Sequence, residues 1–285
     1  MHLGFILWAM GTSMAVRWAW WPGVGSWQVR WWRAVLALVY PLGLLLSTAL
    51  AILGMGHHGT MLGWAVSPLG CRVSQLGLGL GLLVLLYGLF QVGWTAWHWR
   101  QYAWVDLPQG SRARLVETPV PWAAQVGFWR AALVVSRGWL DQLSPAEQRI
   151  ILAHEQAHAH YRDPLWFWLL GLARRLTIWL PRTEALWREL LLLREIRADR
   201  CALNQADPLT VAELLVKMSR PSPLGSTDGQ PLQASFSHPD ELDRLEQRID
   251  ALLQPLPEGD RLSLGTLGLG LTPMLLPLLA MTLHR

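Results

Sequence analysis

The stretch ILAHEQAHAHYRDP, which begins at Ile151, places three histidines and a glutamate at spacings that can support metal chemistry. On a helix, His154 and His158 are four residues apart and share one face, so both imidazoles can bind one ion. Glu155 lies one step around the helix, beside the ion, where its carboxylate can act as a general base. This HExxH spacing predicts two zinc ligands with the base between them.

A catalytic zinc ion needs a third protein ligand and one open position. In LLLREIRADRCAL, Glu195 and Asp199 are four residues apart on a predicted helix, so both can face the first helix. We expect Glu195 to be the third ligand and Asp199 to accept a hydrogen bond from a ligating histidine. His160 is a weaker candidate because it lies about 200° around the helix from His158. Glu189 is also weaker, because no acid follows it four residues on.

The segment with Glu195 and Asp199 has an alternative interpretation as a solvated charged face. Three arginines lie among its acids: Arg194, Arg197 and Arg200. Pairs of opposite charge at helical spacing are common on exposed helices. Taken by itself, this segment is therefore compatible with both interpretations.

Capping signals locate the two helices that must carry these residues. Ser144 is a predicted N-cap, Pro145 fits the first helical position and Glu147 completes a capping box. We expect Asp163-Pro164 to end this helix. Thr183 is expected to cap the second helix, which should run to about residue 204.

Other elements of the polar region follow from apolar patterning. Short strands are predicted from residues 112 and 131, with a third ending near Gly127, and a last helix is predicted after His238-Pro239, to about residue 253. The loop before it, residues 219–233, is rich in Pro, Gly and Ser. Residues 164–181 are strongly apolar but contain two central arginines, which predicts a helix packed under the site or resting at the inner membrane leaflet.

Both ends of the chain have the composition of membrane segments. Of the 285 residues, 52% are hydrophobic and 15% are charged, and no Asp or Glu occurs before Asp106 or after Asp260. Uncharged stretches long enough to span a bilayer occur at residues 34–56, 73–99 and 262–283. A fourth stretch, residues 2–21, is interrupted by Arg17, which we expect to reach the headgroups from the helix end. A cleaved signal peptide is disfavoured because the positive charges follow the apolar core.

The distribution of arginine predicts the orientation of these spans. The loop RWAWWPGVGSWQVRWWR is basic and rich in tryptophan, which is typical of a cytoplasmic loop with an aromatic belt. The next loop carries one arginine and should lie outside. The polar region, about residues 100–260, is then cytoplasmic.

The remaining composition excludes other classes of protein. The net charge of +4 comes almost wholly from arginine, and no basic block suited to nucleic acid is present. Cys71 and Cys201, expected on opposite sides of the membrane, make neither a disulfide framework nor a metal site. A transporter is disfavoured because the predicted spans are almost free of polar residues.

The motifs around these candidate ligands resemble those of known families. HEQAH followed by EIRAD is similar to the HExxH…ExxxD pattern of membrane-bound zinc proteases, the HtpX and CAAX prenyl protease family and its relative, the BlaR/MecR-type sensor-transducer proteases. The stretch VVSRGWLDQLSPAEQRIILAHEQAHAHYRD resembles both. The order of spans resembles the BlaR/MecR type more closely. The resemblance in sequence covers about residues 100–255. The outer spans resemble these families only in topology.

The resemblance also implies further site residues. SHPDELDRLEQRI is similar to the region of CAAX-type proteases where a histidine and an arginine six residues later stabilise the oxyanion, which implies His238 and Arg244. An ordinary residue before the proline at a helix start is the alternative interpretation of His238. A substrate strand is expected to pair with the edge formed by Ala123, Gln125 and Gly127.

Two departures from these families limit what the resemblance implies. BlaR/MecR proteins carry a large penicillin-binding sensor after their last span, so we expect no direct β-lactam sensor here. CAAX-type enzymes usually have more spans around a chamber, so four spans put farnesylated substrates in doubt.

We therefore expect a mainly α integral membrane protein with about four transmembrane helices and a cytoplasmic α+β zincin-like (gluzincin) domain. Its parts are a membrane region (1–100), a zinc metallopeptidase domain (101–260) and a C-terminal span (261–285). The expected function is a zinc endopeptidase of the plasma (inner) membrane, with one Zn²⁺ per chain, that cleaves a protein such as a regulator or a membrane protein. The alternative is a membrane transducer or scaffold whose zinc domain binds a partner without cutting it.

Overall fold

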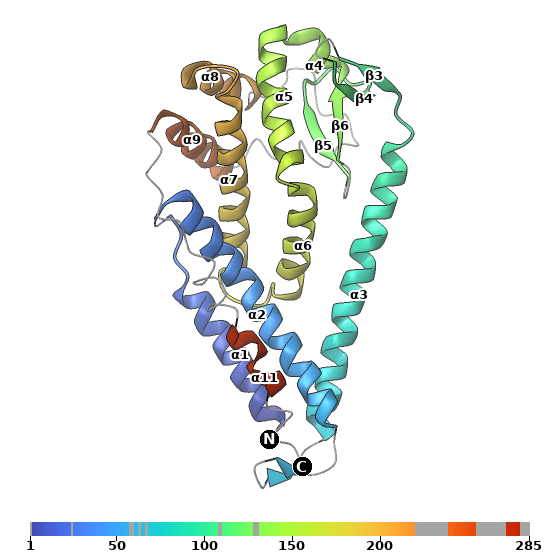
Figure 1. Ribbon diagram of the computed structural model, residues 1–285, viewed down its shortest axis with the longest axis vertical. Coiled ribbons are helices and arrows are strands. Elements are labelled where there is room, and N and C mark those ends of the chain that lie inside the picture. The colour runs from blue at the N-terminus through green and yellow to red at the C-terminus, as the bar shows by residue number, and fades with distance from the viewer. Residues whose placement is uncertain are drawn as a thin grey trace. The chain divides into compact units, whose positions relative to one another are not determined.

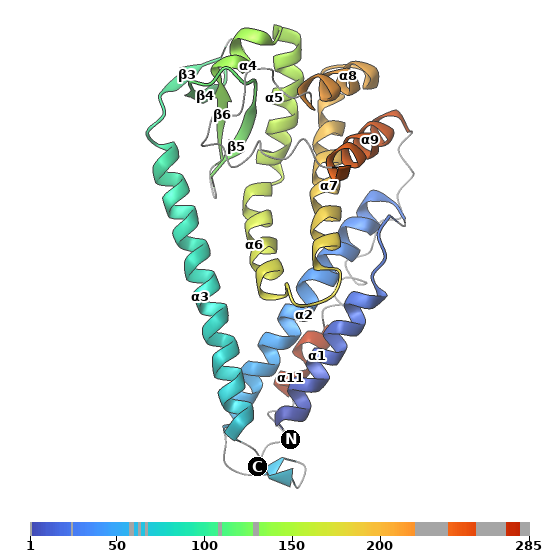
Figure 2. The same ribbon diagram turned by 180° about the vertical axis from the view of Figure 1, so that it is seen from behind.

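A computed structural model describes residues 2–23, 25–56, 60–61, 64–65, 68–107, 110–127, 131–219, 239–254 and 272–279. The chain forms two compact units. The first contains Met1–Phe90, Trp168–Leu191 and Pro257–Arg285, and the second contains Gln91–Phe167 and Leu192–Leu256. Figures 1 and 2 show the elements of both units.

The first unit is built from long apolar helices. They are α1 (His2–Ala19), α2 (Trp27–Met55) and α3 (Pro68–Trp99), with a two-stranded hairpin of β1 (Thr60–Met61) and β2 (Trp64–Ala65) before α3. The 3-10 helix η1 (Thr272–Leu275) and α11 (Leu276–Leu279) pack on α2. Both α2 and α3 begin several residues before the predicted spans, because the helices extend through the flanking aromatic and polar residues.

Within the described residues, α2 and α3 are long and apolar enough to cross a membrane, by length and composition alone. Buried positions make up 44% of the most apolar window of α2 but only 6% of that of α3, so α3 presents almost its whole surface outward. The predicted C-terminal span comprises residues 262–283, and most of it, residues 262–271 and 280–283, lies outside the described residues.

Arg17 does not reach out of the helix end as expected. Its guanidinium is fully buried and donates to the hydroxyls of Thr177 and Thr183 and to the carbonyl of Leu38. Thr183 in turn donates to the carbonyls of Thr177 and Leu180, so its hydroxyl does not act as the predicted cap. Because oxygen atoms of the chain accept its hydrogen bonds, the guanidinium of Arg17 has polar partners without reaching the headgroups.

Like α3, which the boundary divides after Phe90, two further helices contribute to both units. α6 (Asp163–Leu176) and α7 (Thr183–Ala202) form a helical hairpin whose middle, Trp168–Leu191, belongs to the first unit. The predicted long helix from Thr183 is confirmed, although it ends two residues early. The apolar segment after Pro164 is the predicted helix, and it packs closely on α3 at Gly88, where a Cβ would lie 3.0 Å from Leu172.

The second unit contains a four-stranded sheet and the helices that carry the candidate site. The sheet order is β3 (Trp104–Asp106), β4 (Arg112–Val116), β6 (Ala132–Ser136), β5 (Ala123–Val126). β4 and β6 are parallel and the other pairs are antiparallel. The three predicted strands are confirmed, and β3 is an addition. β6 is a central strand with four buried residues, whereas β5 lies at an edge.

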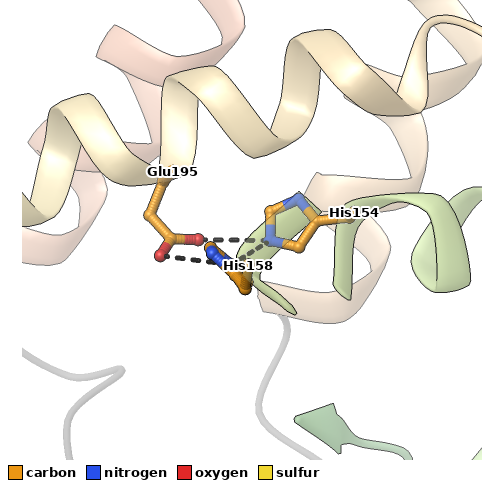
Figure 3. A group of neighbouring side chains, drawn as sticks. All are labelled: His154, His158 and Glu195. Atoms are coloured by element: carbon orange, nitrogen blue, oxygen red, sulfur yellow. Dashed lines mark hydrogen bonds and ion pairs between the residues drawn. The ribbon is translucent and has the colours of Figure 1, made fainter. Parts of the chain in front are cut away.

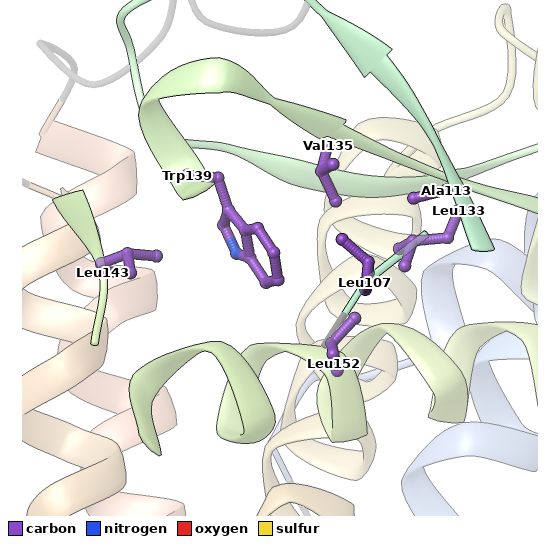
Figure 4. Packing of buried hydrophobic residues seen from close by; sticks show 7 residues of the cluster. All are labelled: Leu107, Ala113, Leu133, Val135, Trp139, Leu143 and Leu152. Carbon is purple, nitrogen blue, oxygen red and sulfur yellow. The ribbon is translucent and has the colours of Figure 1, made fainter. Parts of the chain in front are cut away.

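Helices complete the second unit around two cores. They are α4 (Arg137–Gln142), α5 (Pro145–His160), α8 (Pro208–Ser219) and α9 (Pro239–Leu253), together with the ends of α6 and α7. One core packs the sheet on α4 and α5 around Trp139, as Figure 4 shows; its members are Leu107, Ala113, Leu133, Val135, Trp139, Leu143 and Leu152. The other core joins α5, α7, α8 and α9; its members are Ile150, Ala202, Val211, Ala212, Leu214 and Leu252. These cores hold α5, α7 and α9 together.

Candidate metal and catalytic site

The first two candidate ligands project from a helix with a well-defined start. α5 begins with the predicted capping box: the Ser144 hydroxyl accepts from the Glu147 backbone, and the Glu147 carboxylate accepts from the Ser144 backbone. The helix ends at His160, three residues before the predicted stop at Asp163. Arg162 then adopts a left-handed φ of 54°, and Asp163 begins α6.

The imidazoles of His154 and His158 point toward each other, with their Nε2 atoms 3.1 Å apart. Each Nδ1 lies against a carboxylate: His154 Nδ1 is 2.9 Å from Asp199, and His158 Nδ1 is 2.8 Å from Asp163. An Nδ1–H that donates to a carboxylate leaves Nε2 as the atom with a free electron pair. When both rings are neutral, the two electron pairs therefore face the same point.

Glu195 on α7 brings a carboxylate to this point, as Figure 3 shows. Its oxygens lie 3.3 Å from His154 Nε2 and 3.8 Å from His158 Nε2. Among the described residues these three side chains form a group that could hold a metal ion, with one ligand atom from each within 4.8 Å of the others. Two imidazole nitrogens and a carboxylate oxygen are a donor set suited to zinc. The residues present therefore fit the ion that the sequence predicts.

The carboxylate of Glu195 is strongly biased toward its charged form. Burial opposes ionisation, but Arg194, a hydrogen bond from His154 and the charge of Arg248 outweigh it and hold the pKa of Glu195 well below its ordinary range. The guanidinium of Arg194 donates to the Oε1 atom of Glu195 at 2.6 Å. The other oxygen, Oε2, is the one nearer His154 and stays available for an ion.

Without a metal ion, His154 carries a proton. Burial disfavours the imidazolium, but hydrogen bonds and charges from Asp199 and Glu195 outweigh burial and raise the pKa of His154 to about 10. A proton on Nε2 occupies the position that an ion would take. Binding of a metal ion must therefore displace it.

Glu155 is buried beside the ligand group, and its environment differs from that of Glu195. Burial raises the pKa of Glu155, and the opposing charges of His154 and His158 only partly offset this. A hydrogen bond from the Gln125 backbone to the carboxylate also lowers the pKa in part. A carboxylate with a raised pKa is suited to accept a proton and return it.

The edge strand β5 lies alongside α5 (Figure 1). The Ser136 backbone donates to the Trp122 carbonyl, so in the β5–β6 ladder residues 122, 124 and 126 turn their peptide groups toward β6. The alternate residues Ala123 and Gln125 turn theirs outward, and the outward N–H of Gln125 is the one that meets Glu155. Gly127 follows the strand with a φ of 129°, a conformation that favours glycine. Within the described residues, the three predicted substrate-binding residues therefore lie at or just after the edge strand of the sheet, beside Glu155.

α9 contributes an arginine that sequence reasoning missed. Arg248 makes two hydrogen bonds of 2.7 Å to Asp199, and its Nη2 lies 3.7 Å from Glu195. The predicted Arg244 lies one turn earlier on the same helix and is partly exposed. His238 lies outside the described residues. Asp199 thus links His154 on one side to Arg248 on the other.

Asp163 is the second missed residue, because it was expected only to end a helix. Its carboxylate accepts from Arg197 as well as lying against His158. The guanidinium of Arg197 also lies 4.0 Å from the centre of the Tyr161 ring. The only sequence signal was an acid shortly after the HExxH helix. The alternative interpretation placed Arg194 and Arg197 on a solvated face. In the structure, both arginines bind acids of the site.

The two rival ligands lie elsewhere. His160 is exposed and packs its ring edge-on against Tyr161. Glu189 belongs to the first unit, where its carboxylate pairs with Arg30 at 2.8 Å. Neither residue joins the group formed by His154, His158 and Glu195.

Two curated proteins named as proteases are similar to part of this chain. The chain is 31% identical over 156 residues to "Protease HtpX homolog 2" of Methanosarcina mazei, covering 42% of this chain and 52% of that protein. It is 31% identical over 150 residues to the protein of the same name from Methanosarcina acetivorans, covering 40% and 50%. The chain thus spans about half the length of these relatives. No family model and no solved structure matches it. The two similarities support a relationship to HtpX-like proteases and do not favour the non-proteolytic alternative.

Proposed function

We propose that this chain is a membrane-anchored zinc endopeptidase that hydrolyses peptide bonds of a protein substrate. One observation carries the proposal: His154, His158 and Glu195 direct one ligand atom each to a common point beside the buried carboxylate of Glu155. Each histidine is also oriented by a carboxylate at Nδ1, which is the usual arrangement around a ligating imidazole.

In the proposed mechanism, His154, His158 and Glu195 would hold one Zn²⁺ per chain, which would supply a Lewis acid able to lower the pKa of water to about 7 and to polarise the peptide carbonyl. Glu155 accepts the proton of the attacking water and donates it to the leaving amine. The burial that raises the pKa of Glu155 suits both steps, because the proton must be held between them.

The surrounding residues position this machinery. Asp199 and Asp163 hold the imidazoles of His154 and His158 in the orientation that frees Nε2. Arg248 holds Asp199 in place and keeps it ionised. The resemblance to CAAX-type proteases adds His238 and Arg244 as stabilisers of the developing oxyanion, a role that we retain as part of the proposal.

We propose that the substrate binds as an extended segment along β5. The outward peptide groups of Ala123 and Gln125, with Gly127 beyond them, offer main-chain hydrogen bonds to such a strand. The N–H of Gln125 already bonds Glu155, so a substrate strand pairs with the remaining groups or displaces that bond when Glu155 takes up its water.

The membrane placement is likewise a proposal. α2 and α3 are apolar and long enough to cross a bilayer, and the outer ends of the chain lack acidic residues. We assign residues 1–100 to the membrane, 101–260 to a cytoplasmic peptidase domain and 261–285 to a final span, in a multi-pass protein of the inner membrane. Its partners are the lipid bilayer and a regulator or membrane protein as substrate.

The deciding experiment compares two carboxylates in the same ion site. Glu155→Gln leaves the ligands intact but cannot accept a proton, so it should keep zinc and lose at least about a hundredfold in casein cleavage. Glu195→Gln should lose zinc and activity together, because a ligand is removed. Zinc content and cleavage rate are measured on the same purified full-length preparations. Normal cleavage by Glu155→Gln contradicts the mechanism, and tight zinc binding by Glu195→Gln moves the third ligand elsewhere.

A further inference from the structure

The tip of the α6–α7 hairpin, residues 176–182, presents large apolar side chains on its surface. Ile178 is 64% exposed and Trp179 is 46% exposed, and they are adjacent. The indole N–H of Trp179 donates to the carbonyl of Leu176 within the tip, so it needs no other partner. Two large apolar groups at the end of a hairpin are suited to an apolar phase rather than to water.

Contacts within the first unit place this tip beside the apolar interior of α2. Arg17 donates to Thr177 within the tip, to Thr183 directly after it, and to the Leu38 carbonyl of α2. Leu38 lies eleven residues after Trp27, the first residue of α2, which is about 16 Å along the helix. The tip therefore lies well past the aromatic start of α2 and against its uncharged stretch.

The hairpin also packs on α3, the second apolar helix of the unit. The indole N–H of Trp168 donates to the Gly88 carbonyl at 3.3 Å, and a side chain at Gly88 would meet Leu172. Most of α3 is exposed, with Leu83 and Leu86 among its outward side chains. Because the hairpin packs on α3, a bilayer that surrounds α3 would also lie next to the hairpin.

The arginines of the hairpin have partners that suit a membrane interface. Arg182 lies 4.5 Å from the Trp21 ring and donates to the Trp20 carbonyl, at the end of α1. Arg175 lies 5.7 Å from the Tyr87 ring, and Arg174 pairs with Glu184 at 2.6 Å. Arginine on tryptophan and tyrosine rings is typical of the headgroup level, where cations reach phosphates and aromatic rings bridge to the acyl region.

From these contacts we propose that the α6–α7 tip is an interfacial membrane anchor. Ile178 and Trp179 insert into the acyl region of the cytoplasmic leaflet, and Arg174, Arg175 and Arg182 lie at headgroup level. The inference rests on the membrane placement proposed above. It adds a lipid-binding surface between the two metal-binding motifs of the sequence, on a hairpin that enters the bilayer without crossing it.

The test uses the full-length chain in a cysteine-free background, Cys71→Ala with Cys201→Ala. Single cysteines replace three side chains of matched exposure: Ile178 (64%), Leu83 of α3 (66%) and Leu209 of α8 (61%). Each variant, with its zinc content checked as a measure of folding, is treated with a membrane-impermeant maleimide in inside-out vesicles. Ile178→Cys and Leu83→Cys should react roughly tenfold or more slowly than Leu209→Cys, and detergent should remove the difference.

A second measurement distinguishes whether lipid or protein covers the tip. A fluorophore attached at Ile178→Cys should be quenched by phosphatidylcholine that carries a nitroxide on its acyl chain, in proteoliposomes of otherwise unlabelled phosphatidylcholine. Protection without quenching means that protein covers the tip, and this overturns the inference. Rapid labelling of Ile178→Cys with slow labelling of Leu83→Cys also overturns it and leaves the membrane placement standing. Rapid labelling of both Ile178→Cys and Leu83→Cys overturns the anchor and the membrane placement together.

Discussion

Two glutamates within the same site are given different properties by their neighbours. Glu195 faces Arg194, Arg248 and His154, which keep its pKa low, as a ligand requires. Glu155 is buried with only partial compensation, so its pKa is raised, as a proton carrier requires. The same side chain thus serves as ligand or base according to the charges around it.

Metal binding should release a proton from His154. The ordinary histidine pKa is 6.5, and in the metal-free site it is raised to about 10. Between pH 7 and 9 an ordinary histidine is mostly neutral, but His154 still holds its proton, which the ion must displace. We expect about one proton released per zinc at pH 8, and an apparent affinity that rises about tenfold per pH unit over this range.

Calorimetry of zinc binding in buffers with different ionisation enthalpies measures this proton. Asp199→Asn provides the control, because it removes a charge that raises the pKa of His154. Proton release at pH 8 should fall in that variant. Release that is zero in the unsubstituted protein, or equal in both proteins, contradicts the assignment.

At the scale of elements, Arg248 of α9 pairs with two acids of α7, Asp199 and, at 3.7 Å, Glu195. Arg248 makes both of its short contacts to Asp199, which is almost fully buried, and Asp199 orients His154. Breaking the pair leaves a buried carboxylate without its cation, which is costly. The position of α9 should therefore control the geometry of a ligand on α5.

We expect Arg248→Ala to weaken zinc binding about 10- to 100-fold, the range typical of residues that orient a metal ligand. Arg248→Lys should recover part of this affinity, because the charge is kept while the two-pronged geometry is lost. Arg244→Ala, one turn away, is the matched control and should leave zinc affinity unchanged. The zinc dissociation constant of each variant is measured by competition with a chelator. Equal losses in Arg244→Ala and Arg248→Ala would show a general effect on α9 instead.

The edge strand β5 allows a test of substrate pairing by proline substitution. Gln125 turns its N–H outward, so Gln125→Pro leaves the β6 ladder intact and should lower the melting temperature little. It should nevertheless reduce cleavage strongly, because the outward donor is lost. Ala124→Pro removes a ladder hydrogen bond to β6 and should destabilise the fold instead. Thermal unfolding and casein cleavage are measured for both; full activity of Gln125→Pro rules out a role for this donor.

At the scale of the whole molecule, the arginine distribution predicts one orientation in the membrane. A reporter fused in the loop after Gly56 should lie outside, and one fused in the loop of residues 219–233 should lie in the cytoplasm. Most of both loops lies outside the described residues, so the prediction depends on the sequence. Paired alkaline phosphatase and green fluorescent protein fusions report the two sides. Finding both loops on one side rules out the proposed arrangement of spans.

Much of the candidate site could be predicted because its signals are local. The capping box at Ser144 and the four-residue spacing of His154 and His158 depend only on helix geometry, and the structure has both. The same spacing on α7 correctly predicted that Glu195 and Asp199 face this helix. The strands predicted from residues 112 and 131, observed from Arg112 and Ala132, also follow from short local runs of apolar residues.

Tertiary structure alone decided which distant residues complete the site. Arg244 and Arg248 share one face of α9, so the sequence cannot tell which turn meets Asp199; the packing of α9 on α5, α7 and α8 selects Arg248. Asp163 reaches His158 because Arg162 reverses the chain with a positive φ, a conformation that no local signal demanded. Arg17 was expected at the headgroups because hydropathy counts only its charge, whereas the hydroxyls of Thr177 and Thr183 that accept its hydrogen bonds lie 160 and 166 residues away in the sequence. Helix periodicity acts over a few residues, but the partners of a buried charge depend on how whole elements pack.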